Sequence, residues 1–343
     1  MTGVDEVSNS IKASLVLTVT AMIWGFAFVA QRSGVEHVGP FLFNGTRCVL
    51  GAVVLFVVMW VQGRFVAARQ ARQELAAGSA DSPEPTPSRL STPRLPLIKR
   101  LWADTSIRGG IWCGLALFAG SSCQQVGLVT TPASQSGFLT VMYVVLVPIF
   151  GLMIGQKTRW TAWVSVAISL VGLYLLCVKD GLHIASGDLI LLLGACFWTV
   201  HIIVVDRTVK RAQVFRLSCV QFLTAGVLSL AASLFLDHFF THGEPTWQGL
   251  VQVWPQLVYV GVLSSGIGFT MQAIGQRHAP PAVAAIVMSL ESVFACIGGV
   301  LLLGERMTGR ESLGCALVFI AVLVAQIVPK SASASESAVQ TPV

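Results

Sequence analysis

Long apolar stretches, separated by mostly short polar connections, follow one another along almost the whole chain. The hydrocarbon core of a bilayer is about 30 Å thick, so a helix needs about 20 mostly apolar residues to cross it. Ten stretches meet this requirement and predict an all-α integral membrane protein with ten transmembrane helices. The expected spans are 12–30, 40–61, 109–129, 133–154, 160–178, 187–205, 214–236, 254–275, 281–303 and 311–328.

The last five spans repeat the layout of the first five. An offset of 174 places Trp24 on Trp198, and an offset of 149 places Pro132 on Pro281 after the longest connection. Because five is odd, the two halves would cross the membrane in opposite directions. Inverted repeats of this kind are typical of secondary transporters, whose substrate site lies near the midplane between the halves. We therefore expect a first repeat at 12–178 and a second repeat at 187–328.

Polar segments predict how the chain is oriented. The connection 62–108 contains five Pro mixed with Ser, Thr and Arg, a composition that cannot bury a core. We expect it to be a cytoplasmic loop inserted in the first repeat, and 329–343 to be a disordered cytoplasmic tail. With both termini in the cytoplasm, 17 Lys and Arg fall on that side and four outside. This asymmetry follows the positive-inside rule.

Composition excludes several classes of protein. Charged residues make up 11% of the chain and hydrophobic residues 54%, whereas soluble domains contain about 25% charged residues. The net charge of +6 comes from loops, so it does not indicate a nucleic-acid partner. The eight Cys form no CxxC pair, and no GxxxxGK[ST] phosphate loop is present. We expect no metal site, no cofactor and no use of ATP as the energy source.

Four segments resemble the drug/metabolite transporter superfamily, and within it the EamA type. The resemblance implies two inverted five-helix repeats around a central cavity, and transport of amino acids, other metabolites or drugs, frequently as export. Ser292 stands where the family often has Pro, which predicts a straighter ninth span, and Gln156 replaces a first-half Glu. The segments are IWGFAFVAQR (23–32), GPFLFNGTR (39–47), GFLTVMYVVLVPIFGLMIGQ (137–156) and SLESVFACIGGVLLLGER (289–306).

Glu291 lies near the middle of a 23-residue span. A charge at this depth costs about 2.5–3.5 kcal/mol on the insertion scale, so such side chains usually face a cavity or a partner. Glu291 is therefore a candidate for proton coupling or for binding a substrate amine. A glutamate that joins two helices through a hydrogen bond fits the sequence equally well.

Arg47 is the other strong charge inside a span. It could bind a substrate carboxylate or phosphate at two points, or extend toward the membrane surface and bond carbonyls. Asn44 lies one turn earlier on the same helix, and Gln221 is the repeat counterpart of Arg47.

Further candidates are polar or aromatic side chains at helical spacing. His201 follows Trp198 by three residues and is a candidate for a proton partner of Glu291, or for a hydrogen bond to a neighbouring helix. Trp24, Tyr143 and Gln272 belong to stripes that could line a cavity or serve as contacts between helices.

These features predict a secondary transporter in the cell inner (plasma) membrane, exporting small metabolites or amino acids by alternating access, with protons as a candidate coupling ion. The alternative is an exchanger or importer of an anionic or nucleotide-linked metabolite, with Arg47 as its anchor. An intramembrane enzyme is a distant alternative, because the chain lacks a catalytic cluster such as HExxH.

The predicted orientation can be tested by proteolysis. Protease added to sealed spheroplasts should leave the connection 62–108 intact, and permeabilised cells should be cut there. Cleavage without permeabilisation would contradict the cytoplasmic assignment. A periplasmic protein whose integrity is followed in parallel reports whether the spheroplasts are sealed.

Overall fold

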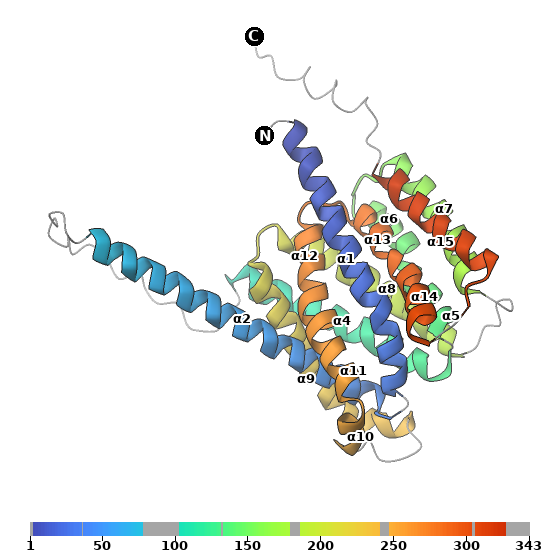
Figure 1. Cartoon of the computed structure of the whole chain (residues 1–343), viewed down its shortest axis with the longest axis horizontal. Coiled ribbons are helices and arrows are strands. Elements are labelled where there is room, and N and C mark those ends of the chain that lie inside the picture. Colours follow the sequence, from blue (N-terminus) through green and yellow to red (C-terminus); the bar gives the residue numbers. More distant parts are fainter. Residues whose placement is uncertain are drawn as a thin grey trace, which may run out of the picture.

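The computed structural model describes residues 3–35, 37–77, 103–131, 133–178, 186–240, 247–303 and 306–326. All regular elements in these ranges are helices (Figure 1). They are α1 (Gly3–Val35), α2 (Pro40–Ala77), α4 (Thr105–Thr130), α5 (Ala133–Val141), α6 (Tyr143–Met153), α7 (Trp160–Cys177), α8 (Ser186–Val209), α9 (Val214–Leu236), η1 (Asp237–Phe239), α10 (Trp247–Gln252), α11 (Trp254–Val258), η2 (Tyr259–Phe269), α12 (Thr270–Gln276), α13 (Pro281–Met288), α14 (Leu290–Leu303) and α15 (Gly309–Ala325).

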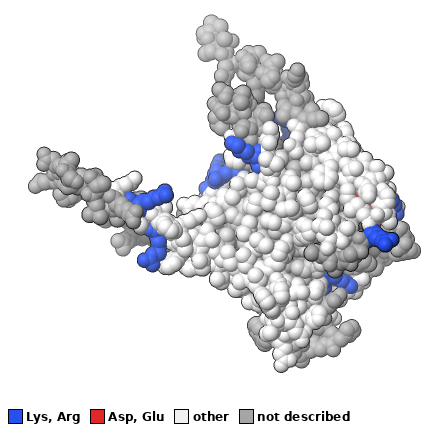
Figure 2. Space-filling view, viewed as in Figure 1, with Lys and Arg blue, Asp and Glu red and all other residues white. Residues whose placement is uncertain are grey.

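The all-helical membrane fold predicted from the sequence is confirmed. Eight helical stretches among the described residues are long and apolar enough to cross a membrane. Helices α4 and α15 occupy the two remaining expected ranges, 109–129 and 311–328. Large apolar side chains are exposed on many of the helices, and Figure 2 shows a broad surface without charged side chains between basic groups at its margins. Such a surface suits contact with lipid.

The packing of the second half repeats that of the first. Helix α2 packs against its counterpart α9, and α7 packs against its counterpart α15. Helix α1 packs against α14, while its counterpart α8 packs against α5 and α6. In the same way α8 and α9 pack against α4, whereas α1 and α2 pack against η2. The two halves thus exchange equivalent contacts, and their opposite orientation in the membrane stays a prediction.

The second helix is longer than the apolar pattern predicts. We expected span two to end at residue 61 and a loop to begin at 62, but α2 continues to Ala77. The residues added are mainly Ala, Gln, Arg, Glu and Leu, which favour helix even where they are too polar for a membrane. Figure 1 shows this end of α2 projecting from the bundle. Residues 78–102 of the expected loop and the expected tail lie outside the described residues.

Helices α7 and α15 approach each other backbone to backbone. A Cβ added at Gly172 would lie 2.8 Å from the carbonyl oxygen of Gly314, and one at Gly314 would lie 2.6 Å from the oxygen of Gly172. Small residues commonly allow such close contact between membrane helices. This pair packs against α13 and α14, which contribute to the cavity described below.

The buried carboxylate of Asp237 anchors the beginning of α2. Its two oxygens accept hydrogen bonds from the backbone N–H groups of Phe41 and Leu42, each at 2.9 Å. These N–H groups belong to the first turn of α2, where no partner exists within the helix. The contact therefore joins the end of α9 to the start of α2.

Replacing Asp237 by Ala should lower the thermal unfolding midpoint of the purified protein in detergent. The loss should correspond to about 1.5–3 kcal/mol, the range for hydrogen bonds to a charged group. Asp237→Asn keeps one acceptor oxygen and should lose about half as much. Equal midpoints for wild type and Asp237→Ala would show that the capping contact contributes nothing to stability.

Candidate functional site

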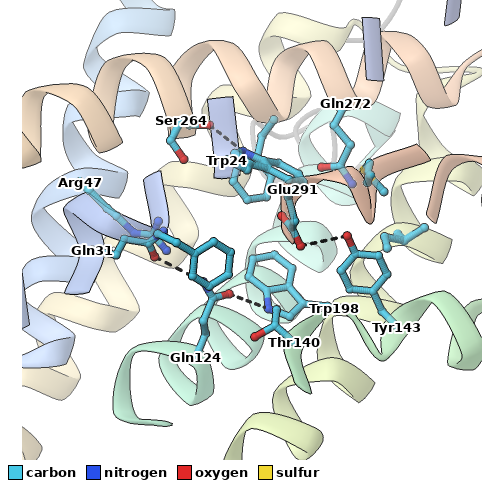
Figure 3. Close-up of a pocket in the computed structure, with 14 residues that line it drawn as sticks. Trp24, Gln31, Arg47, Gln124, Thr140, Tyr143, Trp198, Ser264, Gln272 and Glu291 are labelled. Atoms are coloured by element: carbon cyan, nitrogen blue, oxygen red, sulfur yellow. Dashed lines mark hydrogen bonds between the residues drawn. The ribbon is translucent and has the colours of Figure 1, made fainter. Parts of the chain in front are cut away.

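A cavity with about 40 Å³ of free space lies between helices of both halves (Figure 3). Such a volume holds only a few water molecules, because one water needs roughly 10–15 Å³ measured in this way. A metabolite would therefore require movement of the surrounding side chains or helices. The lining residues are Trp24, Phe28, Gln31, Arg47, Gln124, Thr140, Tyr143, Trp198, Ile202, Ser264, Phe269, Gln272, Met288 and Glu291.

Two spans bring Tyr143 and Glu291 together. In the fourth expected span a single turn residue, Met142, separates α5 from α6, and in the ninth Ser289 separates α13 from α14. Both residues keep right-handed helical backbone dihedrals, so each span continues through them. The straightness of the ninth span relative to relatives with Pro at position 292 stays a prediction. The hydroxyl of Ser289 bonds the carbonyl of Ile286, a local contact that competes with regular helix bonds.

Glu291 lies in the first turn of α14. It is 4% exposed, and the hydroxyl of Tyr143 donates to its Oε1 at 3.1 Å. No Lys, Arg or His of the described residues lies within ion-pair distance of this carboxylate. A carboxylate in this setting can hold a proton or receive a cationic group.

Arg47 lies on another wall of the cavity and is also 4% exposed. Its Nε donates to Oδ1 of Asn44 at 2.9 Å. The sequence places Asn44 one turn before Arg47, and the structure shows that Asn44 supports the arginine without itself lining the cavity. Burial at the cavity makes Arg47 a candidate for binding an anionic group there.

Aromatic rings separate parts of the cavity wall. Trp24 and its repeat counterpart Trp198 both contact Phe269, with ring centroids 4.6 Å and 5.9 Å from it. The indole of Trp24 donates to the carbonyl of Ser264 at 3.2 Å. The indole of Trp198 donates to Gln124 at 3.1 Å. Both rings are thus held in place by polar contacts from neighbouring helices.

Two polar atoms in the wall are free to bind water or substrate. Oγ1 of Thr140 and Oε1 of Gln272 are buried and have no hydrogen-bond partner within the described ranges. Most buried polar groups in proteins are hydrogen-bonded. These atoms therefore indicate places where a bound molecule would gain a contact.

His201 and Gln221 pair with each other outside the cavity wall. Nε2 of His201 and Oε1 of Gln221 are 3.1 Å apart, and the imidazole lies edge-on to Trp198 and Phe269. Neither residue lines the cavity. The structure thus favours the helix-joining interpretation of His201 over that of a proton partner for Glu291.

Of the predicted site residues, the structure brings Glu291, Arg47, Trp24, Tyr143 and Gln272 to one cavity. Sequence reasoning did not identify Gln31, Ser264 or Phe269. The repeat offset could have identified Trp198, because it is the counterpart of Trp24. The lining residues Ser264 and Phe269 belong to η2, an 11-residue π-helix, a form that is rare and often found at functional sites.

Tyr143→Phe should destabilise the protein, because it leaves the buried Glu291 without its hydroxyl donor. We expect the free energy of unfolding to fall by about 1–3 kcal/mol. Thermal unfolding of the purified protein in detergent would measure this change. A double-mutant cycle with Glu291→Gln should be non-additive, since the two side chains interact directly. Strictly additive effects would contradict the hydrogen bond between them.

Comparison with known proteins gives a consistent result. An uncharacterized transporter of Archaeoglobus fulgidus is 25% identical over 95% of this chain and 89% of its own length. The uncharacterized transporter YoaV of Bacillus subtilis is 23% identical, over 90% of this chain and 94% of its own length. The uncharacterized inner membrane transporter YedA of Escherichia coli K12 is 24% identical, over 88% of this chain and 87% of its own length.

A protein of known crystal structure shares the fold. It superposes with a TM-score of 0.65 over 93% of this chain and 99% of its own, at 18% sequence identity. The model of the EamA-like transporter family matches residues 11–76 and 185–326, which together are more than half of the chain. The chain is a multi-pass membrane protein and belongs to the EamA-like transporter family.

Proposed function

We propose that the protein exports small metabolites or amino acids across the cell inner membrane by alternating access, driven by protons that bind Glu291. The observation that carries this proposal is the environment of the Glu291 carboxylate. It is buried at a cavity between the two halves, where the Tyr143 hydroxyl is its one hydrogen-bond partner among the described residues. An ionised group so placed is costly unless it is compensated.

Two kinds of species can compensate this carboxylate. A proton neutralises it, and a cationic group of a substrate pairs with it. Because both use the same oxygens, binding of one excludes the other. Such competition links outward movement of substrate to inward movement of protons, provided that the cavity opens to one side at a time. The small free volume of the cavity supports the condition that it opens to one side at a time, because a larger substrate requires the helices to rearrange.

An exchanger or importer of an anionic metabolite is the second candidate function, and Arg47 supports it. Its guanidinium is buried at the same cavity, and no carboxylate of the described residues lies within ion-pair distance. An anionic substrate would then bind together with a proton on Glu291, so that proton and substrate move in the same direction. The intramembrane enzyme has no comparable support: among the described residues no group of three or more His, Cys, Asp or Glu could hold a metal ion.

Glu291→Gln tests proton coupling, because glutamine keeps the size and hydrogen-bonding capacity of glutamate but cannot titrate. Purified protein in liposomes would be supplied with radiolabelled amino acids and small organic acids, with and without a pH gradient. We expect Glu291→Gln to retain exchange at equal pH and to lose accumulation driven by the gradient.

Glu291→Asp is the matched control, since it retains a titratable carboxylate and should retain part of the gradient-driven flux. Thermal unfolding of each variant shows whether it is folded. Normal gradient-driven transport by a stable Glu291→Gln protein would rule out the coupling role. Accumulation of substrate on the side toward which protons flow, and not on the opposite side, would favour the second candidate function.

A further inference from the structure

Asn44 connects three helices through its side-chain amide. Its Nδ2 donates to the hydroxyl oxygens of Ser121 on α4 at 2.9 Å and Ser229 on α9 at 2.8 Å. Its Oδ1 accepts from Nε of Arg47 at 2.9 Å. The residue is 0% exposed, so no solvent competes for these contacts.

The network determines which way the amide points. The hydroxyl of Ser121 donates to the carbonyl of Leu117 at 2.6 Å, so its oxygen must accept from Asn44. A reversed amide would direct its NH₂ group at the guanidinium, which contains donors and no acceptor. The amide oxygen is therefore held toward Nε of Arg47.

This contact leaves the far edge of the guanidinium available. Nη1 and Nη2 of Arg47 have no hydrogen-bond partner in the part of the chain that the structure describes, and Arg47 lines the cavity. Two parallel N–H donors on a planar group match the two oxygens of a carboxylate. A buried charge without a partner is costly, so an anion in this place would complete the site.

We propose that Asn44 is a positioning residue that presents the two terminal nitrogens of Arg47 to a carboxylate of the substrate, so that the transported solutes are carboxylates. The inference rests on the proposed transport function and names the substrate class of that site. Only the first half supplies this carboxylate-binding pair of Asn44 and Arg47. Gln221, the repeat counterpart of Arg47, is neutral and paired with His201.

Formate is a suitable probe, because it is a carboxylate of three non-hydrogen atoms and the cavity has room for a few water molecules. The unfolding midpoint of the purified wild-type protein would be measured in formate, chloride and phosphate at equal pH and ionic strength. We expect a saturable rise of the midpoint in formate relative to chloride. A larger rise in phosphate than in formate would overturn the carboxylate assignment.

Variants assign the effect to residues. The rise specific to formate should disappear in Arg47→Gln. It should also disappear in Asn44→Asp, whose carboxylate would itself pair with the guanidinium. It should decrease in Asn44→Leu, which frees the guanidinium to rotate, and in Ser229→Ala, which removes one anchor of the amide and serves if Asn44→Leu does not fold. Gln221→Leu, the matched change in the other half, should keep the rise.

Besides a larger rise in phosphate, three results would overturn the proposal. These are equal midpoints in formate and chloride, a formate effect that survives in Arg47→Gln, and a formate effect that is lost in Arg47→Gln but unchanged in both Asn44→Asp and Ser229→Ala. Comparing the anions separates a positioning role of Asn44 from a purely structural one. If Asn44 only stabilised the fold, its variants would have midpoints lowered equally in formate, chloride and phosphate. The assay involves neither a gradient nor flux, so its outcome is independent of the Glu291→Gln transport test.

Discussion

In hydrocarbon, every backbone N–H and C=O must find its hydrogen bond within the protein, because no water is there to replace it. This constraint favours continuous helix in the spans, where each N–H and C=O pairs within its own segment. Among the described spans, the regular helix pattern changes at Met142, at Ser289 and in the π-helix η2. Residues within η2 and next to Met142 and Ser289 line the same cavity. Irregular backbone thus coincides with the place where the helices enclose polar groups.

The cavity combines two features that a membrane interior normally excludes. It holds one acidic and one basic side chain, Glu291 and Arg47, each supported by a neutral partner, Tyr143 or Asn44. Neutral partners orient a charged group without neutralising it, so the charge stays available to a third species. Aromatic rings and amides complete the wall. This arrangement suits a carrier, which must release its ligand as readily as it binds it.

The sequence predicted most of the fold because apolar runs of sufficient length have few alternatives to helix in a membrane. Its main error concerned α2, where 62–77 is too polar to be buried but has the composition of a helix. Apolarity and helix propensity are separate physical properties, and the prediction used only the first. The changes of helix pattern at Met142 and Ser289 were not predicted, because neither residue is Pro or Gly, the residues that most strongly interrupt a helix.

The sequence predicted those residues of the candidate site whose burial in a membrane costs free energy. Glu291 and Arg47 stand out in the sequence because a charge in a span needs a reason. Gln31 and Phe269 carry no such cost, and only the three-dimensional arrangement assigns them to the cavity. For His201 the sequence left two interpretations open, and its contact with Gln221 favours the one in which it joins two helices.

The contact between Gly172 and Gly314 has a consequence for the genetics of this protein. A methyl group at either position would overlap the main chain of the opposite helix. A methyl at Gly172 would also touch Val318, but a smaller side chain there would leave the overlap with the main chain in place. A mutant altered at one of these codons therefore has no neighbouring side chain whose truncation would make room. Selection for restored transport should yield true revertants at the same codon, whereas losses caused by crowded side chains elsewhere should yield second-site suppressors.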